Sequence, residues 1–140
     1  MAKLVVFTDG AARGNPGPAG AGFVVKNAEQ KIIFSGKKFL GKKTNNEAEY
    51  EAVLLALNWL DGCQGLSQEE VEFYLDSQLL ANQLSGNWKI KANNLKPLIF
   101  EIKRKIASLE IKARFFHLPR EKNSRADYLA NLAIDEKRNY

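Results

Sequence analysis

The sequence has little cysteine and histidine and contains no long apolar run. Cys63 and His117 are the only residues of their types among 140. A single cysteine forms no intrachain disulfide, which favours a reducing compartment, and these two side chains are too few for a typical zinc site. The apolar run Leu4–Phe7 is too short for a signal peptide or a membrane span. We therefore expect a cytoplasmic or nucleoid protein that does not associate with membranes.

Length and composition are those of an ordinary globular domain. Hydrophobic residues make up 45% of the chain and charged residues 26%, which excludes disordered and collagen-like classes. A chain of this length has room for one core. Residues 1–140 are therefore predicted to form a single domain.

Positive charge is concentrated in one part of the chain. The formal net charge is +5 and the isoelectric point is near 9.3. Ten basic and three acidic residues lie between Lys89 and Lys122, a charge of +7, so the remainder carries −2. Such a segment is typical of a surface that binds phosphate, although a solvated helix face has the same composition. A polyanionic partner is one of the two interpretations.

Hydrophobic periodicity predicts a mixed α/β fold. Apolar segments bounded by glycine, asparagine and aspartate are typical of strands. At Thr44 the period changes to 3.6 residues, and Thr44 with Glu47 forms a capping-box pattern that marks a helix start. Helices between the later strands indicate a mixed sheet covered by helices. The predicted strands are 4–8, 22–26, 32–40, 71–75 and 111–117, and the predicted helices are 44–60, 77–84, 94–108 and one starting near 124.

Two aspartates follow predicted strands. Asp9 ends the first strand and shares a face with Val5 and Phe7, which are expected in the core. Asp76 ends the fourth strand. Each has a structural explanation, because aspartate forms turns and caps helices. However, sites in α/β sheets commonly lie at the carboxyl ends of parallel strands.

Two further carboxylates belong to helices. Glu49 lies four residues before Val53 on the core-facing stripe, where a carboxylate needs a partner. Asp127 lies in the first turn of the last helix and alone is explained by the helix dipole. If all four carboxylates converge, a cation must neutralise them, and oxygen ligands favour Mg²⁺ or Mn²⁺. Two such ions about 3.5–4 Å apart perform in-line phosphodiester hydrolysis.

Four motifs follow one another along the chain. They are Asp9-Gly10-Ala11 with Gly14-Asn15-Pro16-Gly17-Pro18-Ala19-Gly20, then Thr44-Asn45-Asn46-Glu47-Ala48-Glu49-Tyr50, then Asp76-Ser77-Gln78, then Pro119-Arg120-Glu121-Lys122-Asn123-Ser124-Arg125-Ala126-Asp127. No motif is specific alone, but four in the correct order make coincidence improbable. Together they closely resemble the motifs of type 1 ribonuclease H, and the resemblance runs from about Lys3 to Ile134.

The resemblance implies a fold and an activity. The fold is a five-stranded mixed sheet, with three antiparallel N-terminal strands and two parallel strands, flanked by helices. The activity is hydrolysis of the RNA strand of RNA/DNA hybrids with two Mg²⁺ or Mn²⁺ ions, leaving 5′-phosphate and 3′-hydroxyl ends. The implied metal ligands and catalytic carboxylates are Asp9, Glu49, Asp76 and Asp127. The Thr-Asn-Asn-x-Ala-Glu spacing of the family matches Glu49 and not Glu47, which would point about 160° around the helix from Glu49. We expect a monomer, and cleavage of other RNA-containing duplexes stays open.

The resemblance also implies a set of substrate-binding residues. Four polar residues match minor-groove contacts that detect 2′-hydroxyls, namely Asn15, Asn45, Asn46 and Gln78. Gly10 permits close approach of the substrate to the backbone. Thr44 and Asn94 match a pocket for a phosphate of the DNA strand, with Asn93 as the alternative register. Trp88 matches an aromatic of the DNA channel, or packs in the core. The full set is Gly10, Asn15, Thr44, Asn45, Asn46, Gln78, Trp88, Asn94 and Asn123.

The sequence departs from the family pattern in two places. Residues 87–96 are shorter than the basic handle of many members, which implies weaker binding to the hybrid. The mobile histidine before the last acidic ligand has no clear counterpart. Arg120 occupies the shortened loop as a cation for a substrate or product phosphate, but it cannot shuttle a proton near neutral pH. His117 is the other candidate for this loop role, because an ungapped count places it ten residues before Asp127. Its place on or at the end of the last strand favours Arg120 in the loop and a structural role for His117.

Two other functions remain open from the sequence. One is another nuclease, resolvase or integrase on the same fold, which the Thr-Asn-Asn helix start and Gln78 disfavour. The other is a hybrid-binding module without catalysis. The four carboxylates disfavour this interpretation, because negative charge facing phosphate gives a binding module no advantage.

Overall fold

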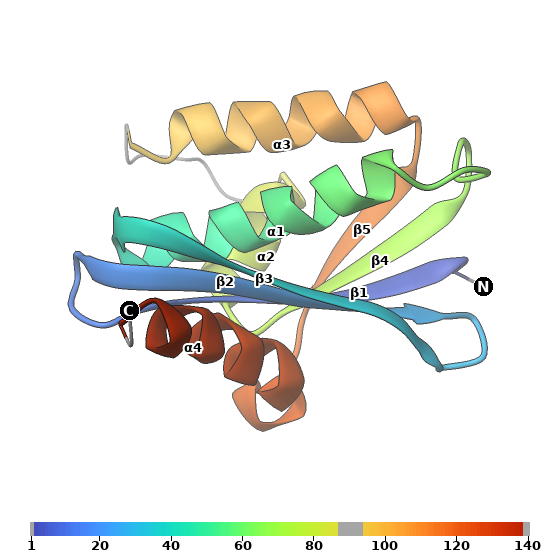
Figure 1. The fold of residues 1–140 in the computed structure, drawn as a ribbon. Helices are drawn as coiled ribbons and strands as arrows, with labels where there is room; N and C mark the ends of the chain where they lie inside the picture. The colour runs from blue at the N-terminus through green and yellow to red at the C-terminus, as the bar shows by residue number, and fades with distance from the viewer. Residues whose placement is uncertain (1, 87–93, 139–140) are drawn as a thin grey trace.

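Five strands form one mixed sheet in the computed structural model (Figure 1). The structure describes residues 2–86 and 94–138. In spatial order the strands are β3 (Ile32–Lys43), β2 (Gly17–Asn27), β1 (Leu4–Ala12), β4 (Glu70–Leu75) and β5 (Lys112–His117). The first three pair antiparallel, and β4 runs parallel to both β1 and β5. The predicted sheet is confirmed.

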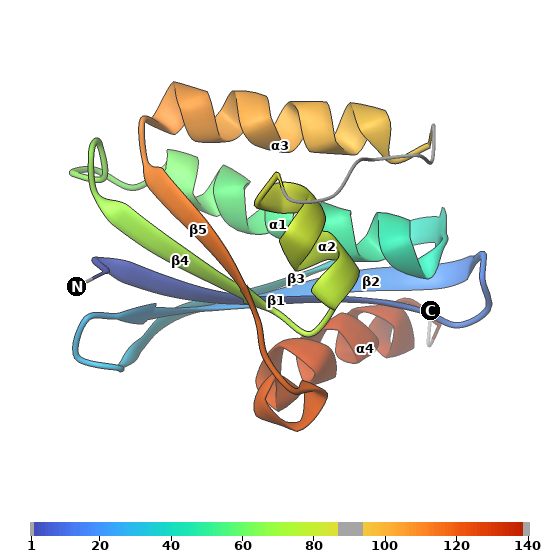
Figure 2. The ribbon, with the colours of Figure 1, turned by 180° about the vertical axis from the view of Figure 1, so that it is seen from behind.

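The helices lie on both faces of the sheet. α1 (Asn45–Asp61), α2 (Gln78–Leu84) and α3 (Lys96–Leu109) lie on one face, and α4 (Ser124–Arg138) lies on the other (Figures 1 and 2). A short 3₁₀ helix, η1 (Arg120–Lys122), precedes α4. The predicted helices are confirmed, with ends shifted by one or two residues. Across residues 2–86 and 94–138, no helix combines the length and apolarity needed to cross a bilayer.

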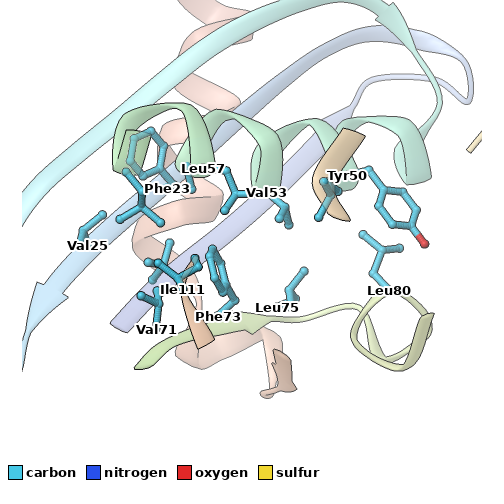
Figure 3. Close-up of a cluster of buried hydrophobic side chains, with 14 of the residues drawn as sticks. Phe23, Val25, Tyr50, Val53, Leu57, Val71, Phe73, Leu75, Leu80 and Ile111 are labelled. Carbon is cyan, nitrogen blue, oxygen red and sulfur yellow. The ribbon is translucent and has the colours of Figure 1, made fainter. Parts of the chain in front are cut away.

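The main core lies between α1 and the sheet (Figure 3). Val53, Leu57 and Leu60 are fully buried, as the 3.6-residue period predicts. At the other end of α1, the buried Tyr50 hydroxyl donates a hydrogen bond to Gln83 of α2. This bond connects α1 to the helix that follows β4. The N-terminal half of α1 is therefore fixed to the last turn of α2.

The first two strands are longer than predicted. Residues Gly10–Ala12 continue β1 and pair with Ala19–Ala21 of β2, although glycine and alanine have low strand propensity. Pairing between the strands overrides local propensity here, so Asp9 lies within β1 and not at its end. The predicted core face is also wrong, because Leu4 and Val6 pack under α1 whereas Val5 and Phe7 are only half-buried.

Glycines let the two helix layers approach the sheet closely. A Cβ on Gly10 would lie 2.1 Å from the Ala48 carbonyl carbon of α1. On the other face, a Cβ on Gly20 or Gly22 would lie 2.2 or 2.5 Å from backbone oxygens of α4. No side chain fits at these distances. The glycines therefore bring the acidic residues of α1 and α4 up to β1.

We expect the substitution Gly22→Ala to destabilise the protein by about 1–3 kcal/mol, since the added methyl group forces α4 away from β2. Chemical denaturation measures this change. Gly62→Ala is the matched control, because its Cβ would lie 3.5 Å from the nearest atom and its φ is −84°. Equal stability of Gly22→Ala and the wild type would contradict the close packing of α4.

Candidate active site

Three carboxylates meet where β1, β4 and α1 come together. One oxygen from each of Asp9, Glu49 and Asp76 lies within 4.8 Å of the other two. Asp9 is in β1, Asp76 follows β4, and the two strands are parallel neighbours. Glu49 reaches them from the second turn of α1, which packs on Gly10. The convergence predicted for these three residues is confirmed.

The three carboxylates lie in a cleft of about 460 Å³. Asp127 lines the same cleft from α4 but is not part of the close group of three. Its Oδ1 is 3.8 Å from Nη2 of Arg120, whose side chain is 79% exposed. The other lining residues are Gly10, Ala11, Ala12, Asn45, Ser77 and Asn131. Among the described residues, the cleft therefore has a negatively charged floor and one cationic side chain, Arg120, at its wall.

Burial and mutual repulsion raise the pKa values of these carboxyl groups. Burial raises the pKa of Asp9 to about 9, with the charges of Glu49 and Asp76 and a hydrogen bond with Asp127 as further causes. The pKa of Glu49 rises to about 8, mainly by burial and then by the charge of Asp76, while Arg120 lowers it. Burial also raises the pKa of Asp76, against a hydrogen bond from Asn123. Neutralisation by protons or by a cation would therefore stabilise the close approach of these carboxylates.

The donor set fits a hard divalent cation. All the converging ligand atoms are carboxylate oxygens, which Mg²⁺ and Mn²⁺ prefer. Oε2 of Glu49 is buried and has no hydrogen-bond partner among the described residues. A buried carboxylate oxygen without a donor is costly unless a cation binds it. Asp9, Glu49 and Asp76 are therefore the residues that can hold a metal ion, with Asp127 beside them.

Asn123 is a buried residue that contacts two parts of the site. It is 2% exposed, and its amide donates to the Thr8 carbonyl of β1 at 2.8 Å. The same side chain hydrogen bonds to Asp76 and lowers its pKa. So deeply buried an amide positions β1, which carries Asp9, and the Asp76 side chain, while the substrate contact of Asn123 stays a prediction.

Sequence analysis missed Asn131. Its amide donates to the Asp127 carbonyl at 3.0 Å and to Oδ1 of Asp127 at 3.4 Å, and it accepts from Arg13 at 3.3 Å. Asn131 lies one helical turn after Asp127, so the spacing of four residues is the signal that identifies it. The asparagine holds the Asp127 side chain toward the cleft.

The N-terminus of α1 is held by the predicted capping box. Thr44 Oγ1 accepts from the Glu47 amide at 3.1 Å, and Glu47 Oε1 accepts from the Thr44 amide at 2.9 Å. These two bonds give Glu47 a structural role at the start of α1. Next to it, Asn15 Oδ1 accepts from the Asn45 amide at 3.0 Å, and Asn45 Oδ1 accepts from the Ala12 amide at 3.2 Å. The β1–β2 turn and α1 are therefore joined beside the cleft.

The other predicted substrate residues are more scattered. Asn46, Gln78 and Asn94 are exposed at the starts of α1, α2 and the turn before α3. Gly10 lines the cleft, but a side chain there would collide with the backbone of α1. The packing of α1 therefore requires glycine at this position. Trp88 and the alternative Asn93 lie outside the described residues.

The described part of the basic segment is partly neutralised. Lys105 pairs with Asp61 at 3.3 Å, Arg114 with Glu70 at 3.8 Å, and Arg104 with Glu101. From this segment, Arg120 is the basic residue that lines the cleft. His117 is exposed at the end of β5, and its charge lowers the pKa of Asp76. Both candidates for the loop role thus act on the carboxylates, but Arg120 lies in the cleft wall.

We expect the metal-free protein to lose stability as the pH rises from about 4 to about 9. The folded-state pKa values of Asp9 and Glu49 lie above the ordinary values of 3.8 and 4.5, so the folded protein binds more protons in this range. Asp9→Asn removes part of the repulsion and raises the unfolding free energy at pH 8 by at least about 1 kcal/mol. Denaturation in EDTA at pH 6 and pH 8 measures both effects. An Asp9→Asn variant that is less stable than the wild type at pH 8 would contradict the repulsion.

The chain resembles known proteins over nearly its whole length. A family model described as "Reverse transcriptase-like" matches residues 7–133. The chain is 38% identical over 134 residues to "Bifunctional protein Rv2228c" of Mycobacterium tuberculosis, covering 95% of this chain and 36% of that protein. It is 36% identical to "Ribonuclease HI" of Halobacterium salinarum (96% and 65% coverage) and 31% identical to "Ribonuclease H" of Alcanivorax borkumensis (97% and 94%). The chain thus spans about a third of the mycobacterial relative and 65% of the halobacterial one.

Solved structures have the same fold. The structure titled "Crystal structure of LC11-RNase H1 in complex with RNA/DNA hybrid" has a TM-score of 0.91 and 40% identity, covering 96% of this chain and 99% of that one. RNase H1 of Halobacterium salinarum has a TM-score of 0.86 and 34% identity, with 95% and 98% coverage. With the fold, the carboxylate cluster and the motifs in agreement, the chain belongs to the type 1 ribonuclease H family.

Proposed function

We propose that the protein hydrolyses the RNA strand of RNA/DNA hybrids and leaves 5′-phosphate and 3′-hydroxyl ends. The observation that carries this proposal is the meeting of Asp9, Glu49 and Asp76 within 4.8 Å in an open cleft. Asp127 and the cationic Arg120 at the cleft wall support it. The structural relative bound to an RNA/DNA hybrid supports the choice of substrate.

The proposed cofactor is a pair of Mg²⁺ or Mn²⁺ ions. Asp9, Glu49, Asp76 and Asp127 would hold them. When bound, divalent ions supply an activated water and a counter-charge for the leaving oxygen. The protein contributes the fixed position of the carboxylates, because Gly10 packs on α1 and Asn123 and Asn131 orient neighbouring groups. Because these contacts fix the carboxylates in advance, little reorganisation is needed during the reaction.

Polar groups beside the cleft are proposed to recognise the duplex. Asn45 lines the cleft and is held by Asn15, so this pair is placed to contact 2′-hydroxyls in a minor groove. Asn46 and Gln78 extend the same polar surface from the helix starts, and Thr44 and Asn94 are proposed contacts for a phosphate of the DNA strand. We also propose that the protein binds other RNA-containing duplexes and acts as a monomer. It is proposed to be cytoplasmic and to form a single domain over residues 1–140.

Arg120 is proposed to bind a phosphate at the cleft wall. Its guanidinium is largely exposed and lies 3.8 Å from Asp127, within reach of an anion in the cleft. Arginine stays protonated at neutral pH, so it stabilises charge without transferring a proton. His117 is left with a structural role at the end of β5.

Asp9→Asn, Glu49→Gln and Asp76→Asn should each reduce cleavage of an end-labelled RNA/DNA hybrid in Mg²⁺ or Mn²⁺ by at least about 100-fold. A bound metal ion contributes several kcal/mol to the transition state, and each 1.4 kcal/mol is tenfold in rate. Glu47→Gln is the matched control, since glutamine also completes a capping box and Glu47 lies outside the cleft. No cleavage by the wild type, or equal cleavage by Asp9→Asn, would contradict the proposal, whereas binding without cleavage would indicate a binding module.

Arg120→Ala should lower the turnover number by about tenfold, because the variant loses one charge-assisted hydrogen bond to phosphate. His117→Ala should leave turnover within about twofold, since surface substitutions change free energies by less than about 0.5 kcal/mol. Single-turnover cleavage of the same hybrid separates the chemical step from product release. If His117→Ala is the slower variant, the loop role belongs to the histidine.

A further inference from the structure

The face of the sheet that carries α4 is only partly covered. α4 packs against β1, β2 and β3. In Figures 1 and 2 it lies alone on this face, and within the described ranges no helix covers β4 and β5 there. Side chains that alternate with the core residues of β4 and β5 therefore face solvent.

Three aromatic side chains form a row across this open face. Phe7, Tyr74 and Phe116 occupy paired positions on β1, β4 and β5. The ring centroids of Phe7 and Tyr74 are 5.5 Å apart and those of Tyr74 and Phe116 5.3 Å apart, and both pairs are stacked. Phe116 ends this aromatic row on the edge strand and is 36% exposed. A flat, apolar ring can continue the row by stacking on Phe116.

A cationic cavity lies at the other end of the aromatic row. It has a volume of about 170 Å³ and is lined by Phe7, Val24, Lys26, Lys122 and Arg125, together with Ile32 and the first residues of α4. Nζ of Lys26 is 5.0 Å from the centroid of the Phe7 ring. None of the three basic side chains forms a salt bridge with a residue in the described ranges. The cavity therefore offers uncompensated positive charge to an anion.

The segment from η1 to the first turn of α4 contributes to both this cavity and the acidic cleft. Arg120 and Asp127 of the segment line the cleft, while Lys122 and Arg125 line the cationic cavity. Different side chains of one short stretch of chain thus line the two sites. They are distinct sites, and the second contains no carboxylate among its lining residues.

We propose that the aromatic row and the cationic cavity bind a short single-stranded stretch of nucleic acid. Aromatic side chains on an open sheet face stack on unpaired bases, and neighbouring basic residues bind the backbone phosphates. A double helix does not fit this surface, because its bases are paired and stacked on one another and offer no free face to an aromatic side chain. A protein partner fits less well, since it leaves the unpaired charges of Lys26, Lys122 and Arg125 without a role. This surface adds a single-strand site to the proposed hybrid nuclease.

The test is fluorescence anisotropy with fluorescein-labelled octathymidylate in EDTA, where no metal-dependent cleavage occurs. The wild type should bind, and Phe116→Ala and Lys26→Glu should each weaken binding by about fivefold or more, the effect of losing one stacked base or reversing one phosphate contact. Lys26→Glu should also flatten the salt dependence of binding. The matched controls are Phe100→Ala and Lys103→Glu. Both residues belong to α3, which lies on the opposite side of the sheet from α4 (Figure 1), and Phe100 is 69% exposed.

No change in anisotropy at protein concentrations up to about 100 µM, the weak limit of non-specific binding, would overturn the inference. Equal weakening by the α3 controls would also overturn it, because the strand would then bind elsewhere. Cleavage of a blunt RNA/DNA hybrid is scored separately, and Phe116→Ala should cleave it at the wild-type rate. Intact cleavage with no oligonucleotide binding would reject the single-strand site and leave the proposed nuclease function standing.

Discussion

Repulsion among converging carboxylates, one of them buried and two partly buried, is the constraint on which the rest of the structure depends. Asp9, Glu49 and Asp76 approach within 4.8 Å, and burial with mutual repulsion raises the pKa of Asp9 to about 9. Such a cluster opposes folding unless protons or cations neutralise it. The surrounding fold must therefore hold these groups together against their charge.

The fold supplies that restraint through backbone packing. Gly10 lets the backbone of α1 lie against β1, and Gly20 and Gly22 let α4 lie against β2 on the other face. Asn123 then connects α4 to β1 through the Thr8 carbonyl. Each element is fixed by contacts that a larger side chain would exclude. The site is thus a consequence of how closely two helices approach one sheet.

Much of the fold and the acidic cluster could be predicted from local patterns. The capping box at Thr44 and the stripe through Val53 locate α1 and orient Glu49, and Asp76 follows an unmistakable strand. The end of β1 could not be predicted, because Gly10–Ala12 form a strand only through pairing with β2. The buried location of Asn123 depends on the packing of α4, and nothing in its neighbouring sequence indicates it. The aromatic row was missed for a similar reason, since Phe7, Tyr74 and Phe116 meet only through strand register.

The most direct test of the central claim is calorimetric titration of the protein with Mn²⁺ at pH 7, in two buffers of different ionisation enthalpy. Because the pKa values of Asp9 and Glu49 are about 9 and about 8, the cluster holds protons at pH 7 that a bound cation must displace. The account predicts Mn²⁺ binding with proton release in the wild type and its loss in Asp9→Asn. Absence of binding, or equal binding and proton release by both proteins, would contradict the assignment of the carboxylate cluster as the metal site.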